Sequence, residues 1–388
     1  MPDPFRDDHP AGGILPAAAN PFRPGAGKVP PAFGGRMQPL LAAKSIVDRL
    51  AVPADPVTMP VLRGFRGMGK TALMAYAREH AAAAGTVTLH IEADPSDTSL
   101  ASTCAGMARD ARPLTTDLPA AFAKRLAALD ITGRVEFHPS SSTDPGSNIE
   151  ALLHDLVLLG DAQRRGILLT VDEAHEAEDL LLKPLVRALH RHAQDARAFG
   201  VIISGLPGVA DTLMEAGQTY TERLASYDLG LLDEDGCAEA LRLPFADDAR
   251  IVVTDAAVAA VHAEAGGYPW FVQLWGAHLW NCLQQAEAVT VDDVERARPN
   301  VERDTGAFYA RRWARVPDGR ARGLVRALAG ASGRAPLRTL LAELGLERSA
   351  QLGPARAELI DRGLVFAPSR GWLAFTVPGF DAWVREHT

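Results

Sequence analysis

Cysteine is scarce in this sequence, and long apolar runs are missing. The three cysteines, Cys104, Cys237 and Cys282, lie far apart and form no Cys-x-x-Cys pair. This spacing argues against a disulfide framework or a zinc finger and favours a reducing cytoplasm. No apolar run reaches the roughly 18 residues that suggest a membrane span, so we expect no membrane partner. The N-terminus has no basic segment followed by an apolar core, so we expect no signal peptide.

Lysine is also scarce, and the charge is unevenly spread. The chain has five lysines against 35 arginines, and its formal net charge is −8. Residues 311–388 carry thirteen arginines, no lysine and seven acidic residues, which makes this region +6 and the rest −14. A basic region on an acidic body fits nucleic-acid binding, but it also fits a solvated helical domain in an arginine-rich protein. The composition leaves both open.

The pattern of apolar residues divides the chain into four predicted parts. Residues 1–35 are rich in proline and glycine, which predicts an N-terminal arm that is either disordered or packed along the next domain. Residues 36–232 form a core in which helices and strands alternate. Residues 233–305 have helical patterns only, and residues 306–388 have helices followed by two short strands.

The predicted strands of the core have no polar face. They are expected at 57–62, 87–93, 166–171, 201–204 and 227–232. The helices are expected at 37–50, 70–84, 100–110, 119–129, 149–165 and 180–193, with a loop at 138–147. Strands of this kind are typical of a parallel sheet that helices cover on both faces. We therefore expect an α/β fold with a five-stranded parallel sheet.

Residues 64–71 match the phosphate-binding pattern G-x-x-x-x-G-K-[ST]. The glycines allow backbone N–H groups to face an anion, and the N-terminus of the following helix adds partial positive charge. Lys70 is expected to contact the β- and γ-phosphates, and Thr71 to bind Mg²⁺. The motif therefore predicts ATP and Mg²⁺ as cofactors. The predicted nucleotide contacts are Gly64, Phe65, Arg66, Gly67, Met68, Gly69, Lys70, Thr71 and Ala72.

Two carboxylates, Asp172 and Glu173, end the apolar strand predicted at 166–171. We expect Asp172 to bind Mg²⁺ and Glu173 to orient the attacking water. Ser204 ends the next apolar strand, and ligands bind at the carboxyl edge of such sheets. Ser204 is therefore predicted to orient the water or to contact the γ-phosphate, although it also suits a turn after a strand.

The loop at 64–71, the Asp172–Glu173 pair and the Ser204-Gly-Leu-Pro segment together resemble an AAA+ P-loop ATPase. The resemblance covers about 33–305 and is to the origin-recognition-like and STAND (archaeal-ATPase-like) branches. It implies that residues 233–305 form a helical lid. It also implies that Arg223 acts as a finger on a neighbouring subunit's γ-phosphate, although a surface arginine explains it equally.

The segment Gly266-Gly-Tyr-Pro269 is similar to the lid element of STAND proteins. The resemblance implies that Pro269 packs near adenine, but proline is also common at the start of a helix. The lid arginine that many family members carry is missing here. We therefore expect slow hydrolysis.

The C-terminal region resembles a winged helix-turn-helix domain. Helices are expected at 337–344 and 349–362, followed by a hairpin at 364–377. Such a domain can bind double-stranded DNA, or it can serve only to pack against other domains. Phosphate contacts would come from Arg348, Arg356, Arg362 and Arg370.

Two functions agree with these observations. The first is a cytoplasmic ATPase that couples its nucleotide state to the binding of DNA or a protein partner, including a second copy of itself. The alternative is a signalling or defence switch that associates with proteins, hydrolyses ATP slowly or not at all, and does not bind DNA. A P-loop kinase is disfavoured because no acceptor-substrate domain is visible.

Overall fold

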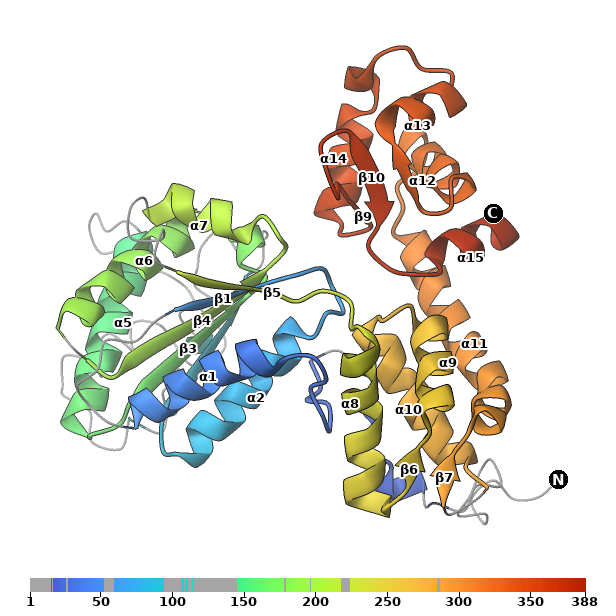
Figure 1. The fold of residues 1–388 in the computed structure, drawn as a ribbon. Helices are drawn as coiled ribbons and strands as arrows, with labels where there is room; N and C mark the ends of the chain where they lie inside the picture. Colours follow the sequence, from blue (N-terminus) through green and yellow to red (C-terminus); the bar gives the residue numbers. More distant parts are fainter. Residues whose placement is uncertain are drawn as a thin grey trace.

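The computed structural model describes most of the chain. The described residues are 15, 17–25, 27–51, 59–93, 106–107, 109–110, 114, 145–177, 179–195, 197–217, 224–284 and 287–388. Cys104, Arg223, the helix expected at 119–129 and most of the helix expected at 100–110 lie outside these residues. Figure 1 shows three parts: a sheet covered by helices, a bundle of helices and a C-terminal module.

Five parallel strands form the central sheet, in the order β2-β3-β4-β1-β5. They are β1 (Pro60–Arg63), β2 (Val87–Glu92), β3 (Ile167–Asp172), β4 (Phe199–Gly205) and β5 (Ala225–Asp228). β3 and β4 are buried along their whole length, which explains why they have no polar face in the sequence. The expected five-stranded parallel sheet is confirmed.

Helices cover both faces of this sheet (Figure 1). One face carries α1 (Met37–Leu50) and α2 (Lys70–Ala83). The other carries α5 (Pro145–Ala162), α6 (Asp179–Gln194) and α7 (Val209–Gly217). α5 begins at Pro145, inside the loop expected at 138–147, because proline suits the first turn of a helix. Within the described residues, no helix is long and apolar enough to cross a membrane.

The strand expected at 227–232 was placed too late in the chain. The observed strand is β5, and residues 229–232 leave the sheet. Leu229 and Leu232 are buried, but in the cluster that α1, α2 and the bundle share. Their apolar side chains mark a buried connection from the sheet to the bundle.

The bundle consists of four helices with a short parallel strand pair at one end. The helices are α8 (Glu234–Pro244), α9 (Asp255–Ala265), α10 (Pro269–Cys282) and α11 (Val291–Ala314), and the π-helical turn η5 (Phe245–Ala249) follows α8. The prediction of helices alone was wrong, because β6 (Val252–Val253) pairs with β7 (Ala288–Val289). α11 runs without a break across residue 305, so the predicted third and fourth parts share one helix.

The described part of the N-terminal arm lies against the bundle. Asn20 Nδ2 donates hydrogen bonds to Ala277 O at 2.9 Å and to Asn281 Oδ1 at 3.0 Å, both on α10. A side chain at Gly276 would overlap the ring of Phe22, which is buried. The described residues of the arm are packed, but Asn20 and Phe22 lie against the bundle and not against the next domain, which Phe33 contacts through Tyr76 of α2 with ring centroids 5.3 Å apart.

The C-terminal module has its own hydrophobic core. Its helices are α12 (Arg320–Gly330), α13 (Leu337–Glu343), α14 (Gly353–Asp361) and α15 (Phe380–His387). Its antiparallel sheet, in the order β8-β10-β9, consists of β8 (Arg334–Pro336), β9 (Val365–Phe366) and β10 (Trp372–Phe375). The expected hairpin is present, but β8 was not foreseen because three residues are too few to show a strand period.

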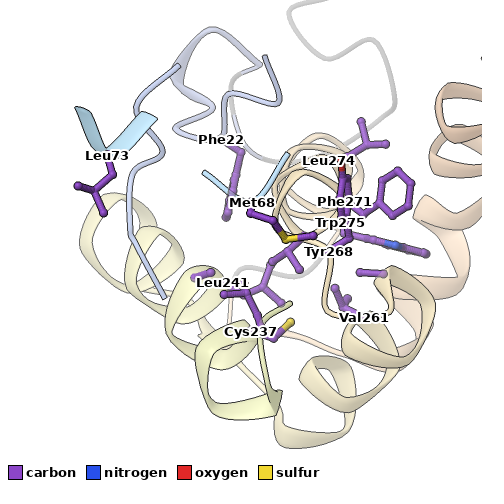
Figure 2. Close-up of a cluster of buried hydrophobic side chains, with 14 of the residues drawn as sticks. Phe22, Met68, Leu73, Cys237, Leu241, Val261, Tyr268, Phe271, Leu274 and Trp275 are labelled. Atoms are coloured by element: carbon purple, nitrogen blue, oxygen red, sulfur yellow. The ribbon is translucent and has the colours of Figure 1, made fainter. Parts of the chain in front are cut away.

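One hydrophobic cluster joins the sheet, the arm and the bundle. Figure 2 shows Met68, from the loop after β1, in this cluster with Cys237, Leu241 and Tyr268 of the bundle. Because all four side chains are buried, the loop and the bundle share one core. This packing holds the predicted phosphate-binding loop against the bundle.

Candidate functional site

The predicted phosphate-binding loop connects β1 to α2, as the motif requires. Gly69 is the residue before α2 and has φ of +91°. Gly67 has φ of +84°, and a Cβ at this position would overlap the Tyr268 hydroxyl. Tyr268 Oη donates a hydrogen bond to Arg66 O at 2.9 Å. Burial raises the pKa of Tyr268 to about 12, so the hydroxyl stays a donor at neutral pH.

Lys70 lies inside the loop and is 4% exposed. Its Nζ donates hydrogen bonds to Gly64 O at 2.8 Å and to Phe65 O at 3.1 Å. Burial lowers the pKa of Lys70, and the carboxylates of Glu173 and Asp172 oppose this effect. The ammonium group is thus held among carbonyl and carboxylate oxygens at the start of α2.

Asp172 joins three elements through its carboxylate. Its Oδ2 accepts a hydrogen bond from Thr71 Oγ1 of α2 at 2.6 Å. Its Oδ1 accepts hydrogen bonds from Ser204 Oγ of β4 and from Glu173 N at 2.9 Å. The structure therefore brings Thr71, Asp172 and Ser204 together. The hydroxyl and carboxylate oxygens of Thr71 and Asp172 are hard donors of the kind that Mg²⁺ prefers.

Glu173 follows β3 in a left-handed backbone conformation, with φ of +50°. A non-glycine residue in this conformation costs about 1 kcal/mol or more, and such residues cluster at functional sites. Oε1 lies 3.8 Å from Arg66 Nε, and Oε2 is buried with no hydrogen-bond partner among the described residues. The nearest ring nitrogen, His175 Nδ1, accepts a hydrogen bond from Leu206 N at 3.2 Å, so it cannot donate to Glu173.

A pocket opens beside the loop and is lined by four segments of the chain. The arm contributes Phe33, and Arg36 follows directly before α1. The loop and α2 contribute Met68, Gly69 and Ala72. The connection after β5 contributes Leu229 and Leu232, and the bundle contributes Pro269 and Gln273. Pro269, the first residue of α10, therefore lies next to the loop residues that were predicted to bind the nucleotide. The lining is almost entirely apolar.

The C-terminal module also contacts the loop. The rings of Phe65 and Phe366 have centroids 4.4 Å apart. Arg66 passes beside Gly363, where a Cβ would lie 3.6 Å from Arg66 Cδ. Gly363 is held in turn by the buried Arg312, whose Nη2 donates to Gly363 O. The sheet, the bundle and the C-terminal module thus meet at the predicted phosphate-binding loop.

Sequence reasoning missed several residues of this site. Tyr268, Gln273 and Phe366 were not singled out, because nothing in their local sequence points to the loop. The place of Tyr268 between Gly267 and Pro269, in a segment already compared with the lid, was the one available signal. Arg223 lies outside the described residues, so its predicted role stays a prediction.

Comparison with solved structures identifies the fold. The ORC2 protein of Aeropyrum pernix, solved as ADPNP–ADP complexes, has a TM-score of 0.54 and 14% identity, over 93% of this chain and 95% of that chain. Cdc6p from Pyrobaculum aerophilum has a TM-score of 0.44 and 12% identity, over 94% and 96%. The RuvB Holliday junction branch migration motor of Thermotoga maritima has 0.45 and 14%, over 88% and 92%.

The likeness to ORC2 shows that the chain shares the fold of that protein, which confirms the predicted AAA+-type fold of the sheet domain. A family model described as a domain of unknown function (DUF8462) matches residues 306–384. This match covers the C-terminal module and the end of α11. No curated protein matches the sequence significantly.

Proposed function

Because the chain has an AAA+ P-loop fold, we propose that it binds ATP with Mg²⁺ and hydrolyses it slowly. We propose further that the nucleotide state controls how the C-terminal module contacts DNA or a protein partner. The observation that carries the first part is the hydrogen bond of 2.6 Å between Thr71 Oγ1 and Asp172 Oδ2, next to the buried Lys70. It joins the two motifs that phosphoryl transfer requires.

In this proposal, each residue around the loop has one role. Lys70 offsets phosphate charge at the helix N-terminus. Thr71 and Asp172 hold Mg²⁺, which when bound supplies further positive charge to the phosphate oxygens. Ser204 fixes the orientation of Asp172 through its hydrogen bond to Oδ1. Phe65, Arg66 and Gly67 surround the phosphates with backbone N–H groups, and Ala72 and Pro269 lie beside the base.

Glu173 is the proposed residue that orients the attacking water. Its Oε2 is a free acceptor in the described structure, which suits this task. Arg66 Nε lies 3.8 Å from the other oxygen, Oε1, and places a positive charge beside the carboxylate. The helix α10 begins with Pro269, Trp270 and Phe271 and offers no arginine at its start, which supports slow turnover.

We also propose that the active form is a homo-oligomer in which Arg223 of a neighbouring copy completes the site. Arg223 shortly precedes β5 in the sequence, as the family's arginine finger does. Residues 233–305 would then act as the lid and residues 306–388 as a winged helix. The two described cysteines, Cys237 and Cys282, are buried free thiols, which supports the proposed cytoplasmic location.

A second candidate is a switch that associates with proteins instead of DNA. It is favoured by α14, the helix that would enter a DNA groove in a winged helix. This helix carries the half-buried Glu358 and the exposed Asp361, and Arg362 at its end is paired with Glu358 at 2.8 Å. Acidic side chains on that helix repel phosphates, so DNA contact would fall to exposed arginines that form no ion pair among the described residues. They include Arg338, Arg348 and Arg370.

The test is steady-state ATP turnover of the full chain, with and without generic duplex DNA, using Glu173→Gln as the blank. Turnover that duplex DNA stimulates, and that salt suppresses, supports the DNA-coupled ATPase. Slow turnover that DNA does not change, together with ATP-dependent association of the chain, supports the second candidate. Absence of both ATP binding and turnover contradicts the proposal as a whole.

A further inference from the structure

The pocket beside the loop contains one polar side chain with an unused acceptor. Gln273 lies on α10, one helical turn after Pro269, and is 8% exposed. Its Oε1 is shielded from solvent and has no hydrogen-bond partner among the described residues. A buried amide oxygen without a partner is uncommon in folded proteins, because its lost hydration is not replaced. The amide oxygen of Gln273 therefore lacks a hydrogen-bond donor, which a ligand in the pocket would supply.

The other residues of the pocket provide almost no polar groups that could bind a ligand. Arg36 is the one other lining residue with a polar side chain, and its Nη2 donates to Gly230 O. The remaining lining residues are apolar or glycine, and none of them is a carboxylate. A ligand group in this pocket is thus recognised by shape, by apolar contact and by a single amide.

We propose that Gln273 selects the base of the bound nucleotide by accepting a hydrogen bond from the exocyclic amine of adenine. A glutamine amide carries an acceptor and a donor side by side, and rotation of the amide by 180° presents either to the pocket. Adenine offers an amine donor next to a ring nitrogen acceptor, which matches such an amide. This inference rests on the proposed binding of a nucleotide at residues 64–72.

The polar groups of the pocket lining disfavour guanine. It carries a carbonyl oxygen where adenine has its amine, and it adds an amine and a ring N–H that need acceptors. The rotated amide can pair with the carbonyl and the ring N–H, but with no carboxylate in the lining, burial leaves the guanine amine without a partner. Leaving buried polar groups unpaired costs more than the hydrogen bond itself contributes.

The experiment compares three nucleotides by calorimetry on the full chain with Mg²⁺: ATP, GTP and purine riboside triphosphate, which lacks the 6-amino group. The wild-type protein is expected to bind ATP roughly tenfold more tightly than purine riboside triphosphate, as for one buried hydrogen bond, and GTP more weakly still. Gln273→Met is expected to bind ATP and the purine analogue with equal affinity, because the side chain that distinguishes the 6-amino group is gone.

Two controls separate this effect from misfolding. Gln38→Met makes the same change on the exposed side of α1, away from the pocket, and should leave all three affinities unchanged. Gln273→Leu repeats the test with a differently shaped apolar side chain, and the thermal midpoint of each variant reports folding. Equal affinity of the wild-type protein for ATP and the purine analogue overturns the inference without any variant.

The outcomes also distinguish this inference from the proposed function. If Lys70→Ala loses ATP binding while Gln273→Met keeps the wild-type ratio of ATP to analogue affinity, the nucleotide site stands and the role of Gln273 is wrong. If the wild-type protein binds none of the three nucleotides, both proposals fail.

Discussion

The ring of Phe65 lies against the ring of Phe366, with centroids 4.4 Å apart and planes at 45°. Phe65 belongs to the predicted phosphate-binding loop, and Phe366 ends β9 of the C-terminal module. This contact is a direct physical link between the two parts, because aromatic pairs of this kind contribute about 0.5–1.5 kcal/mol beyond the area they bury. A change in the loop on binding a nucleotide would reach the module through it.

We therefore expect Phe366→Ala to uncouple the module from the loop. ATP should still bind within a few-fold of wild-type affinity, since Phe366 does not line the pocket. The ATP-induced change in hydrogen exchange at 363–378, expected in the wild-type protein, should disappear. Arg370→Ala, at the exposed tip of the same hairpin, is the matched control and should retain the response. An unchanged response in Phe366→Ala contradicts the link.

Lys70→Ala is expected to abolish ATP binding. The substitution removes a buried charge that, in the proposed function, contacts the phosphates. Charge-assisted hydrogen bonds contribute about 1.5–3 kcal/mol each, so two of them correspond to a loss of at least a hundredfold. Calorimetry with Mg²⁺ and ATP measures this loss. Lys44→Ala, which removes an exposed lysine of α1, should bind ATP as the wild-type protein does. Equal ATP affinity in Lys70→Ala would rule out the site.

Glu173→Gln should separate binding from turnover. The amide keeps the size of the side chain but cannot take up a proton from water, so we expect turnover to fall by about 10²–10⁴-fold with ATP affinity nearly unchanged. Phosphate release and calorimetry on the same preparation give the two values. Glu176→Gln, three residues later, provides the comparison and should keep turnover within a few-fold. If both variants turn over ATP equally fast, Glu173 has no role in orienting water.

The fold should lose stability as the pH falls from about 6.5 towards 4, in part because of His192. This side chain is buried against His154, and neither of its ring nitrogens has a hydrogen-bond partner among the described residues. Burial, with repulsion from His154 and Arg197, lowers the pKa of His192 from 6.5 to about 4. Below pH 6.5 the unfolded chain therefore binds a proton that the folded chain does not, and this difference destabilises the fold by at most about 3 kcal/mol.

His192→Leu tests this prediction. Thermal midpoints at pH 7.5 and 5 should lie closer together in the variant than in the wild-type protein. Leucine cannot be protonated, so the variant lacks the loss of stability that His192 causes at low pH. His387→Leu replaces an exposed histidine at the C-terminus and should keep the wild-type pH dependence. The prediction is wrong if both variants show the same pH dependence as the wild-type protein.

Much of the fold was predictable because its signals are local. The apolar strands β3 and β4 indicate a sheet that is buried on both faces. The phosphate-binding motif is complete within the eight contiguous residues Gly64–Thr71. β5 was misplaced because Leu229 and Leu232 are buried for another reason, as the connection to the bundle. β8 was missed because a three-residue strand has no readable period.

The P-loop motif, the pair of carboxylates at the end of β3 and the alternation of strands and helices could all be predicted from local sequence. Each depends on neighbouring residues whose spacing sets their backbone geometry. Three contacts became visible only in the folded chain: Tyr268 bonds to Arg66 O in the loop, Gln273 lines the pocket beside it, and Phe366 contacts Phe65. Tyr268 and Arg66 are 202 residues apart, and no local period encodes which distant side chains pack together. That choice follows from how the bundle and the C-terminal module bury their apolar surfaces against the sheet.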